Sequence, residues 1–197
     1  MNKKRKTAVE EPSIDAEEAA CRLLLHWPQE GLADDLPELP SLAGVIAQGG
    51  DLEAARSWLQ GREAALFLAI DGPYDARALC DGAVVAFDAE MDGIRRQLGR
   101  DCIIGATCGT SRHAAMVAGE RGADYVLFGQ ADDRAPVDEI VEILVWWRDL
   151  FVIPAAAAGI RTTEEAQAFL DAGADFLMPA ADEPSSLTVA IDRMLAA

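Results

Sequence analysis

Short apolar runs alternate with amphipathic stretches of helical length from about Ile14 to the end of the chain, a pattern typical of βα units on a parallel sheet. Eight such runs can be counted, and most are apolar at nearly every position, as strands buried on both faces are. The 197 residues, about half of them apolar, are enough for one core. Together these observations predict an α/β fold, a single (β/α)8 barrel.

The strands are expected in regular succession. In chain order they are Arg22–His26, Leu42–Ala47, Ala64–Ile70, Ala83–Phe87, Cys102–Ala106, Tyr125–Phe128, Phe151–Ala155 and Phe176–Pro179. Most of them are rich in β-branched or aromatic residues, which favour strands. Between the first two strands, Pro37 and Pro40 leave room only for a short helix or an irregular turn.

Helices are expected between the later strands. They are Leu52–Gln60, Tyr74–Leu79, Met91–Leu98, Ser111–Arg121, Val137–Arg148, Thr163–Ala172 and Ser185–Leu195. Thr110 or Ser111 caps one of them, and Thr162 or Thr163 caps another, near the capping-box spacing to Glu165. Adjacent helical residues point in different directions, so we expect one of Trp146 and Trp147 in the core and the other at the surface.

The start of the chain differs from the rest. Residues 1–13 carry charge but no periodic apolar pattern, so we predict a disordered tail there and one barrel domain over residues 14–197. All three lysines, Lys3, Lys4 and Lys6, lie in this tail. The net charge of -17 argues against nucleic acid and anionic membranes as partners. No apolar run approaches the roughly 20 residues that cross a bilayer, so a cytoplasmic protein is expected.

The motif Gly-Ala-Asp followed by an apolar run occurs twice, in Arg121-Gly-Ala-Asp-Tyr-Val-Leu-Phe and in Asp171-Ala-Gly-Ala-Asp-Phe-Leu-Met. In each copy the glycine ends a helix and the aspartate precedes a strand. Barrel chemistry lies at the opposite, C-terminal ends of the strands. Asp124 and Asp175 are therefore expected to be structural. The four cysteines show no metal-ligand or redox spacing and are expected to be reduced packing residues.

Candidate functional residues follow the strand ends. Ala158-Gly-Ile-Arg-Thr-Thr places an open backbone and a helix N-terminus beside the barrel axis, which favours phosphate binding, although a tight turn would need the same glycine. Asp182 and Glu183 would repel an anion there if they point inward. Asp71, Asp88 and Glu90 could share a magnesium ion with a diphosphate, or could simply be solvated helix caps. His26 could donate a hydrogen bond or a proton to a ligand, or be a structural group.

Four segments carry a family resemblance: Ile103-Ile-Gly-Ala-Thr-Cys-Gly-Thr, Arg121-Gly-Ala-Asp-Tyr-Val-Leu-Phe-Gly, Ile153-Pro-Ala-Ala-Ala-Ala-Gly-Ile and Leu170-Asp-Ala-Gly-Ala-Asp-Phe-Leu-Met. Their order and spacing, across roughly Leu66 to Ala181, resemble the thiamine phosphate synthase superfamily, which includes the TenI-type barrels. The resemblance implies an enzyme of thiamine biosynthesis that joins a pyrimidine diphosphate to a thiazole phosphate with magnesium and releases diphosphate.

The resemblance also implies roles for particular residues. It places the thiazole phosphate at Ala158, Gly159 and Ile160 and at the loop with Ala180 and Ala181. Thr107 matches a serine near the diphosphate, Asp71 matches a magnesium-binding aspartate, and Asp88 is the stand-in for a second one. Gln48 matches the glutamine of the family's Gln-x-Arg-x-Lys segment. The expected site is therefore Asp71, Thr107 and Arg134 for catalysis, His26, Gln48 and Gln130 for substrate, and Asp71 and Asp88 for metal.

The chain departs from the family pattern where charge matters. The family has Pro-Thr-x-Thr-Lys after the sixth strand, whereas this chain has Gln130-Ala-Asp-Asp-Arg-Ala-Pro, so Arg134 is the obvious substitute for the lysine. The usual glycine pair is reduced to Ala158-Gly159. Because the leaving diphosphate needs electrostatic stabilisation, these losses predict weak or no synthase activity.

Two alternatives stay open. One is a non-catalytic or regulatory barrel that binds a phosphorylated ligand, and the other is a different phosphosugar-handling barrel enzyme. A Schiff-base aldolase is excluded within the barrel, because the barrel has no lysine. The expected partner is a small phosphorylated heterocycle. The sequence does not predict the oligomeric state, and a homodimer is retained beside a monomer.

Overall fold

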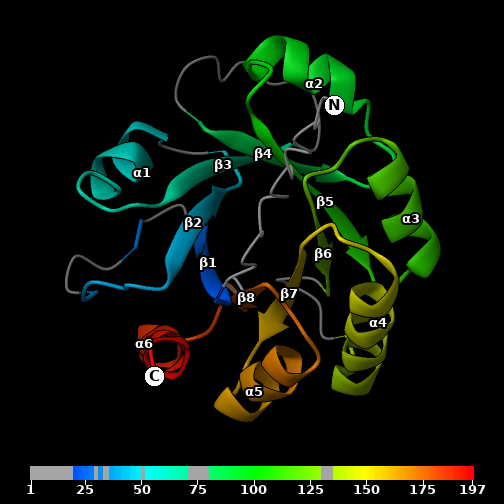
Figure 1. Ribbon diagram of the computed structural model, residues 1–197. Helices are drawn as coiled ribbons and strands as arrows, with labels where there is room; N and C mark the ends of the chain where they lie inside the picture. The colour runs from blue at the N-terminus through cyan, green and yellow to red at the C-terminus, as the bar shows by residue number, and fades with distance from the viewer. Residues whose placement is uncertain (1–19, 29–30, 33–35, 50–51, 71–79, 130–134) are drawn as a thin grey trace, which may run out of the picture.

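The structure is a computed structural model that describes residues 20–28, 31–32, 36–49, 52–70, 80–129 and 135–197. Eight parallel strands form a closed barrel in chain order, as Figure 1 shows. They are β1 (Arg22–Trp27), β2 (Leu42–Ala47), β3 (Ala65–Ile70), β4 (Gly82–Ala86), β5 (Ile103–Gly109), β6 (Tyr125–Phe128), β7 (Ala155–Ile160) and β8 (Phe176–Pro179). The predicted fold is confirmed.

Six helices lie around the outside of the strands in the described part of the chain (Figure 1). They are α1 (Leu52–Trp58), α2 (Met91–Leu98), α3 (Arg112–Glu120), α4 (Val137–Leu150), α5 (Thr163–Asp171) and α6 (Ser185–Leu195). The side chain of Ser111 caps α3 by accepting a hydrogen bond from the N–H of Ala114, and that of Thr162 caps α5 in the same way from Glu165. The predicted helix Tyr74–Leu79 lies outside the described residues.

The seventh strand was predicted wrongly, at Phe151–Ala155. It runs from Ala155 to Ile160, because α4 continues to Leu150 and the N–H of Phe151 still bonds to the carbonyl of Trp147. The ring of Phe151 stacks on that of Trp147 with centroids 4.1 Å apart, so this aromatic residue packs with the helix rather than in the sheet. Alanine is a weak strand former, and the closed sheet overrides that local preference.

Three aromatic rings fill the N-terminal half of the barrel interior, and two glycines make room for them. The ring centroid of Tyr125 lies 5.9 Å from those of Phe67 and Phe176. A methyl group at Gly105 would lie 2.2 Å from Cζ of Tyr125, and one at Gly44 would lie 2.6 Å from the Phe67 ring. Glycine is therefore required where the rings approach the neighbouring strands. The interior is closed at this end, which leaves the other end for a site.

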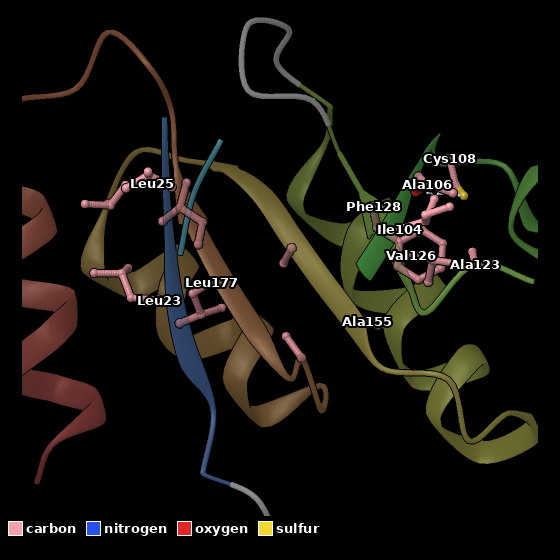
Figure 2. Close-up of a cluster of buried hydrophobic side chains, with 14 of the residues drawn as sticks. Leu23, Leu25, Ile104, Ala106, Cys108, Ala123, Val126, Phe128, Ala155 and Leu177 are labelled. Atoms are coloured by element: carbon pink, nitrogen blue, oxygen red, sulfur yellow. Dashed lines mark hydrogen bonds between the residues drawn. The ribbon is translucent and has the colours of Figure 1, made fainter. Parts of the chain in front are cut away.

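A second apolar layer lies between the strands and the helices. Figure 2 shows part of it, with Leu23 and Leu25 of β1 beside Leu177 of β8. Trp147 of α4 belongs to this layer, whereas Trp146 is half-buried and lies beneath the guanidinium of Arg112 at 5.1 Å. The prediction of one tryptophan in the core is confirmed for Trp147, whereas Trp146 is only partly exposed and also packs against this layer.

Aspartates join neighbouring strands at the N-terminal end of the barrel. A carboxylate oxygen of Asp81 accepts a hydrogen bond from the N–H of Leu66, that of Asp124 from Ile104, and that of Asp175 from Ala155, at 2.7 to 2.8 Å. These bonds link β3 with β4, β5 with β6, and β7 with β8. The predicted structural role of Asp124 and Asp175 is confirmed.

Candidate functional site at the barrel mouth

A pocket of about 480 Å³ opens at the C-terminal ends of the strands. Every strand of the barrel, or the residue or turn that follows it, contributes to its wall. Its lining is His26, Ile46, Gln48, Ala69, Val84, Val85, Phe87, Thr107, Cys108, Gly109, Ser111, Ala114, Leu127, Gly129, Ala158 and Met178. An apolar wall with a few polar groups is typical of a site for a small organic ligand.

The polar side chains that line the pocket carry no permanent charge. The hydroxyl of Thr107 donates its proton to the carbonyl oxygen of Val85 at 3.2 Å, and both of its lone pairs remain as acceptors. Burial raises the pKa of the Cys108 thiol to about 12, so this thiol is protonated at neutral pH and is not a nucleophile. Neither lysine nor arginine lines the pocket within the described part of the chain.

Several predicted site residues meet in this pocket. His26, Gln48, Thr107 and Ala158 all line it, from β1, the end of β2, β5 and β7. Asp71, Gln130 and Arg134 lie outside the described residues. Asp88 is exposed and does not line the pocket, and its backbone carbonyl accepts a hydrogen bond from the Arg121 guanidinium. The roles assigned to all these residues stay predictions.

The predicted phosphate-binding residues lie where β7 and β8 end. Ala158, Gly159 and Ile160 are the last residues of β7 rather than a loop after it. Gly159 has a φ of 85°, a conformation that favours glycine, and the side chain of Ile160 is fully buried in the layer beneath the helices. The N–H of Ala180 donates to the carbonyl of Ile160 at 2.9 Å. Ala181 is exposed and lines a smaller hollow of about 150 Å³ beside His26.

Where β7 and β8 end, the structure has an ion pair that the sequence did not predict. A terminal nitrogen of Arg161 lies 2.9 Å from a carboxylate oxygen of Asp182 and 2.9 Å from one of Glu183. Hydrogen bonding to Arg161 lowers the pKa of Asp182. Asp182 and Glu183 were expected to repel an anion if they pointed inward, and the structure shows that both turn to Arg161. The signal was the arginine directly after Gly159-Ile160.

The described residues do not by themselves form a metal centre. They contain no group of three or more histidine, cysteine, aspartate or glutamate side chains that could hold a metal ion. Magnesium usually keeps several waters and binds through one or two carboxylates plus substrate phosphates. A site shared with a diphosphate therefore needs fewer protein ligands than a protein-only cage.

No helix of the described part is long and apolar enough to cross a membrane.

Comparisons with a family model and with curated relatives point to the same family. The family described as thiamine monophosphate synthase (TMP-TENI) matches residues 58–179, which is more than half of the chain. A thiamine-phosphate synthase of Rhodospirillum centenum is 41% identical over 133 residues, covering 64% of this chain and 63% of the relative. One of Erythrobacter litoralis is 47% identical over 96 residues, covering 46% and 45%. These matches span less than two thirds of either relative.

Comparison with solved structures supports the fold. Thiamine phosphate pyrophosphorylase from Pyrococcus furiosus superposes with a TM-score of 0.64 at 15% identity, covering 91% of this chain and 99% of that one. A putative deoxyribose-phosphate aldolase from Coccidioides immitis gives 0.59 at 18% identity, covering 90% and 85%. Such low identities establish the barrel fold alone. The family is shown by the sequence match over residues 58–179. The chain belongs to the thiamine monophosphate synthase (TMP-TENI) family.

Proposed function

We propose that this protein is a thiamine-phosphate synthase-type transferase of the cytoplasm, which joins a pyrimidine diphosphate to a thiazole phosphate and releases diphosphate. The observation that carries the proposal is the family match over residues 58–179, a range that includes most of the barrel and most of the walls of the mouth pocket. The curated relatives bear the same name. The partner would be a small phosphorylated heterocycle.

The pocket suggests how the reactants would be held. Its apolar wall accepts the ring, and His26, Gln48 and Thr107 offer polar atoms around it. In the reaction the bond from the pyrimidine unit to diphosphate breaks, and the leaving diphosphate takes the electron pair. Charge therefore develops on the diphosphate, and preorganised donors beside it lower the barrier. We assign this place to Thr107, whose hydroxyl would turn from the carbonyl of Val85 to donate to the diphosphate.

We propose that activity is weak. No guanidinium or ammonium group lines the pocket among the described residues, and the guanidinium of Arg161 is bound to two carboxylates. Each missing charged contact to the leaving group costs on the order of 10- to 1000-fold in rate. Arg134, the lysine substitute, would have to supply what the described residues lack.

Magnesium is part of this proposal. Asp71, with Asp88 as a second carboxylate, would hold the ion together with the diphosphate, and the ion would neutralise part of the leaving group's charge. Asp88 is exposed and does not line the pocket, so we assign the larger role to Asp71. Diphosphate affinity should therefore rise when magnesium is added. Equal affinity with and without the ion would remove magnesium from the proposal.

The experiment is product formation at high enzyme concentration from the two heterocycles with magnesium. Thr107→Val should lower kcat/KM by about 10-fold, because it removes one hydrogen bond to the developing charge. Thr110→Val is the matched control, since Thr110 is exposed and lies outside the pocket lining. Asp71→Asn should abolish turnover. Turnover that is unaffected by both Thr107→Val and Asp71→Asn would mean that the reaction occurs elsewhere.

A non-catalytic binding barrel is the second candidate. The observation that favours it is the pocket lining, which has room and polar atoms for a heterocycle but lacks permanent positive charge in the part of the chain that is described. The same samples separate the two functions. Saturable binding of thiazole phosphate with no product at the highest enzyme concentration would favour binding alone.

A further inference from the structure

A second cavity opens at the end of the barrel opposite the mouth. It has a volume of about 490 Å³ and lies where β1, β2 and β3 begin. Arg22, Leu42 and Arg62 are part of its wall, and we call it the lower pocket. Among the described residues, it shares no lining residue with the mouth pocket. The lower pocket is therefore separate from the end of the barrel at which the chemistry of this fold takes place.

Two guanidinium groups distinguish the lower pocket from the mouth. Arg22 stands at the first position of β1, and Arg62 lies in the turn between α1 and β3. The described lining of the mouth pocket contains neither arginine nor lysine. In a chain with a net charge of -17, an anion is attracted most where permanent positive charges are gathered. Of these two cavities, the lower pocket is the one that offers such charges.

Backbone carbonyls hold both guanidinium groups. A terminal nitrogen of Arg22 donates to the carbonyls of Leu42 and Glu63, so this side chain spans the starts of three strands. A terminal nitrogen of Arg62 donates to the carbonyl of Trp58 at 2.6 Å, and its guanidinium lies 4.1 Å above the Trp58 ring. No carboxylate of the described residues forms an ion pair with either arginine. Both groups are thus held in place without losing their positive charge to a partner.

One donor of Arg62 lacks an acceptor. Its Nε atom is buried and makes no hydrogen bond within the described part of the chain. A buried donor without an acceptor costs free energy, so such groups are usually satisfied by water or by a ligand. The Nε–H and a terminal N–H of a guanidinium form the fork that binds two oxygens of a phosphate. After a small movement of the side chain, an oxyanion in the lower pocket would supply the missing acceptor.

The size and charge of the lower pocket indicate a class of ligand. Small organic molecules occupy pockets of roughly 300 to 1000 Å³. A phosphate monoester carries about two negative charges at neutral pH, one for each guanidinium. Glu38 and Glu63 also line the pocket, but both are exposed, so water and salt screen their repulsion. We propose that the lower pocket binds a small phosphate monoester through Arg22 and Arg62, at a site separate from the reaction proposed for the mouth.

Inorganic phosphate is the probe, titrated by calorimetry into the full chain. Arg62→Gln should weaken phosphate binding by about 10-fold, because a charged fork with two hydrogen bonds is lost. Arg22→Gln should also weaken binding. Arg62→Lys keeps the charge but loses the fork, so it should bind phosphate more weakly than wild type. Unchanged affinity in any of the three variants, each shown to be folded by its urea denaturation curve, overturns the proposal.

Trp58 reports where the phosphate binds. Its ring lies beneath Arg62, and no tryptophan is in the described lining of the mouth pocket. Phosphate should change the tryptophan fluorescence of wild type with the same midpoint as the calorimetric titration. Trp58→Phe should remove most of this change and still bind phosphate, since phenylalanine also stacks with a guanidinium. A calorimetric signal with no fluorescence change in wild type would place the phosphate elsewhere and overturn the proposal.

A gain of affinity provides a test that unfolding cannot imitate. Glu38→Gln/Glu63→Gln should tighten phosphate binding by about 3-fold, because two screened negative charges are removed from the pocket wall. Glu139→Gln/Glu142→Gln is the matched control, with both changes at exposed positions of α4, which packs against β6 and β7. Arg96→Gln is the control for the arginine variants, since this α2 side chain is 71% exposed and lies outside the lower pocket. A control that changes affinity as much as its partner overturns the proposal in favour of net charge.

Acetate tests the chemical class of the ligand. With a single negative charge, acetate should bind at least about 10-fold more weakly than phosphate to wild type. Acetate binding as tight as that of phosphate would overturn the assignment to a phosphate monoester. Because none of these titrations uses a thiazole or pyrimidine compound, the lower pocket and the proposed synthase reaction can each fail without the other.

Discussion

The hydroxyl of Tyr125 is buried inside the barrel and has no hydrogen-bond partner among the described residues. Burial raises the pKa of this hydroxyl, so it stays protonated. The ring itself packs between Phe67 and Phe176. A buried hydroxyl without a hydrogen-bond partner lowers the free energy of unfolding, whereas the packed ring raises it. We therefore predict that Tyr125→Phe raises the free energy of unfolding by about 1 kcal/mol. Urea denaturation measures this, and a lower midpoint in Tyr125→Phe would mean that the hydroxyl has a partner in solution.

The thiols of Cys21 and Cys108 predict a dependence of stability on pH. Burial raises the pKa of each to about 12 from an ordinary value of 9.0. Between these values the folded chain binds more protons than the unfolded chain, so the free energy of unfolding falls as pH rises. The urea midpoint should be lower at about pH 10.5 than at about pH 8. The double variant Cys21→Ala/Cys108→Ala should lose less over the same interval; a decline as steep as in wild type would assign it to other groups.

At the scale of elements, the strand pairs of the barrel are joined by one repeated contact. Asp81, Asp124 and Asp175 each bond through the carboxylate to a backbone N–H of the preceding strand. Each backbone N–H of these aspartates also donates to the carbonyl of that same neighbour at 2.8 Å. Each aspartate therefore holds its own strand to the preceding one at a fixed register, through both its carboxylate and its backbone N–H.

This contact predicts a stability effect without a functional one. Asp175→Ala leaves the N–H of Ala155 without its side-chain acceptor, and we expect a loss of about 1 kcal/mol in the free energy of unfolding. Asp171→Ala is the control, because Asp171 is exposed and its carboxylate accepts a hydrogen bond from Gln167 on the same helix. Ligand affinity should be unchanged in both variants. Urea denaturation and a thiazole phosphate titration check the two parts, and altered affinity in Asp175→Ala would contradict the structural role.

At the scale of the whole molecule, the barrel closes when β8 pairs with β1 through Arg22 with Phe176 and Leu23 with Leu177. In the described residues, the closed sheet and its layer of helices surround one large apolar core. We predict that a chain lacking residues 1–13 unfolds at the same urea concentration as the full chain, since this segment has no apolar pattern with which to join the core. A midpoint shifted downward in the shortened chain would mean that the segment contributes to the folded domain.

The sequence by itself determined the fold class, the succession of strands and the family. The β2, β6 and β8 strands lie where their apolar runs predict them, because a short run that is apolar on both faces fits a strand of a parallel sheet covered by helices. It also predicted that His26, Gln48 and Thr107 stand at strand ends, where a barrel places its ligand. These conclusions depend on local pattern, which a sequence contains in full.

Only the tertiary structure decided where β7 lies and what surrounds its end. The alanine run has little strand preference of its own, and it becomes a strand because β6 and β8 offer hydrogen bonds on both sides. The pairing of Arg161 with Asp182 and Glu183 likewise joins residues about 20 positions apart, across two neighbouring strands. The net charge of -17 cannot reveal which carboxylate meets which guanidinium, because that choice depends on strand register and on the geometry of the barrel mouth.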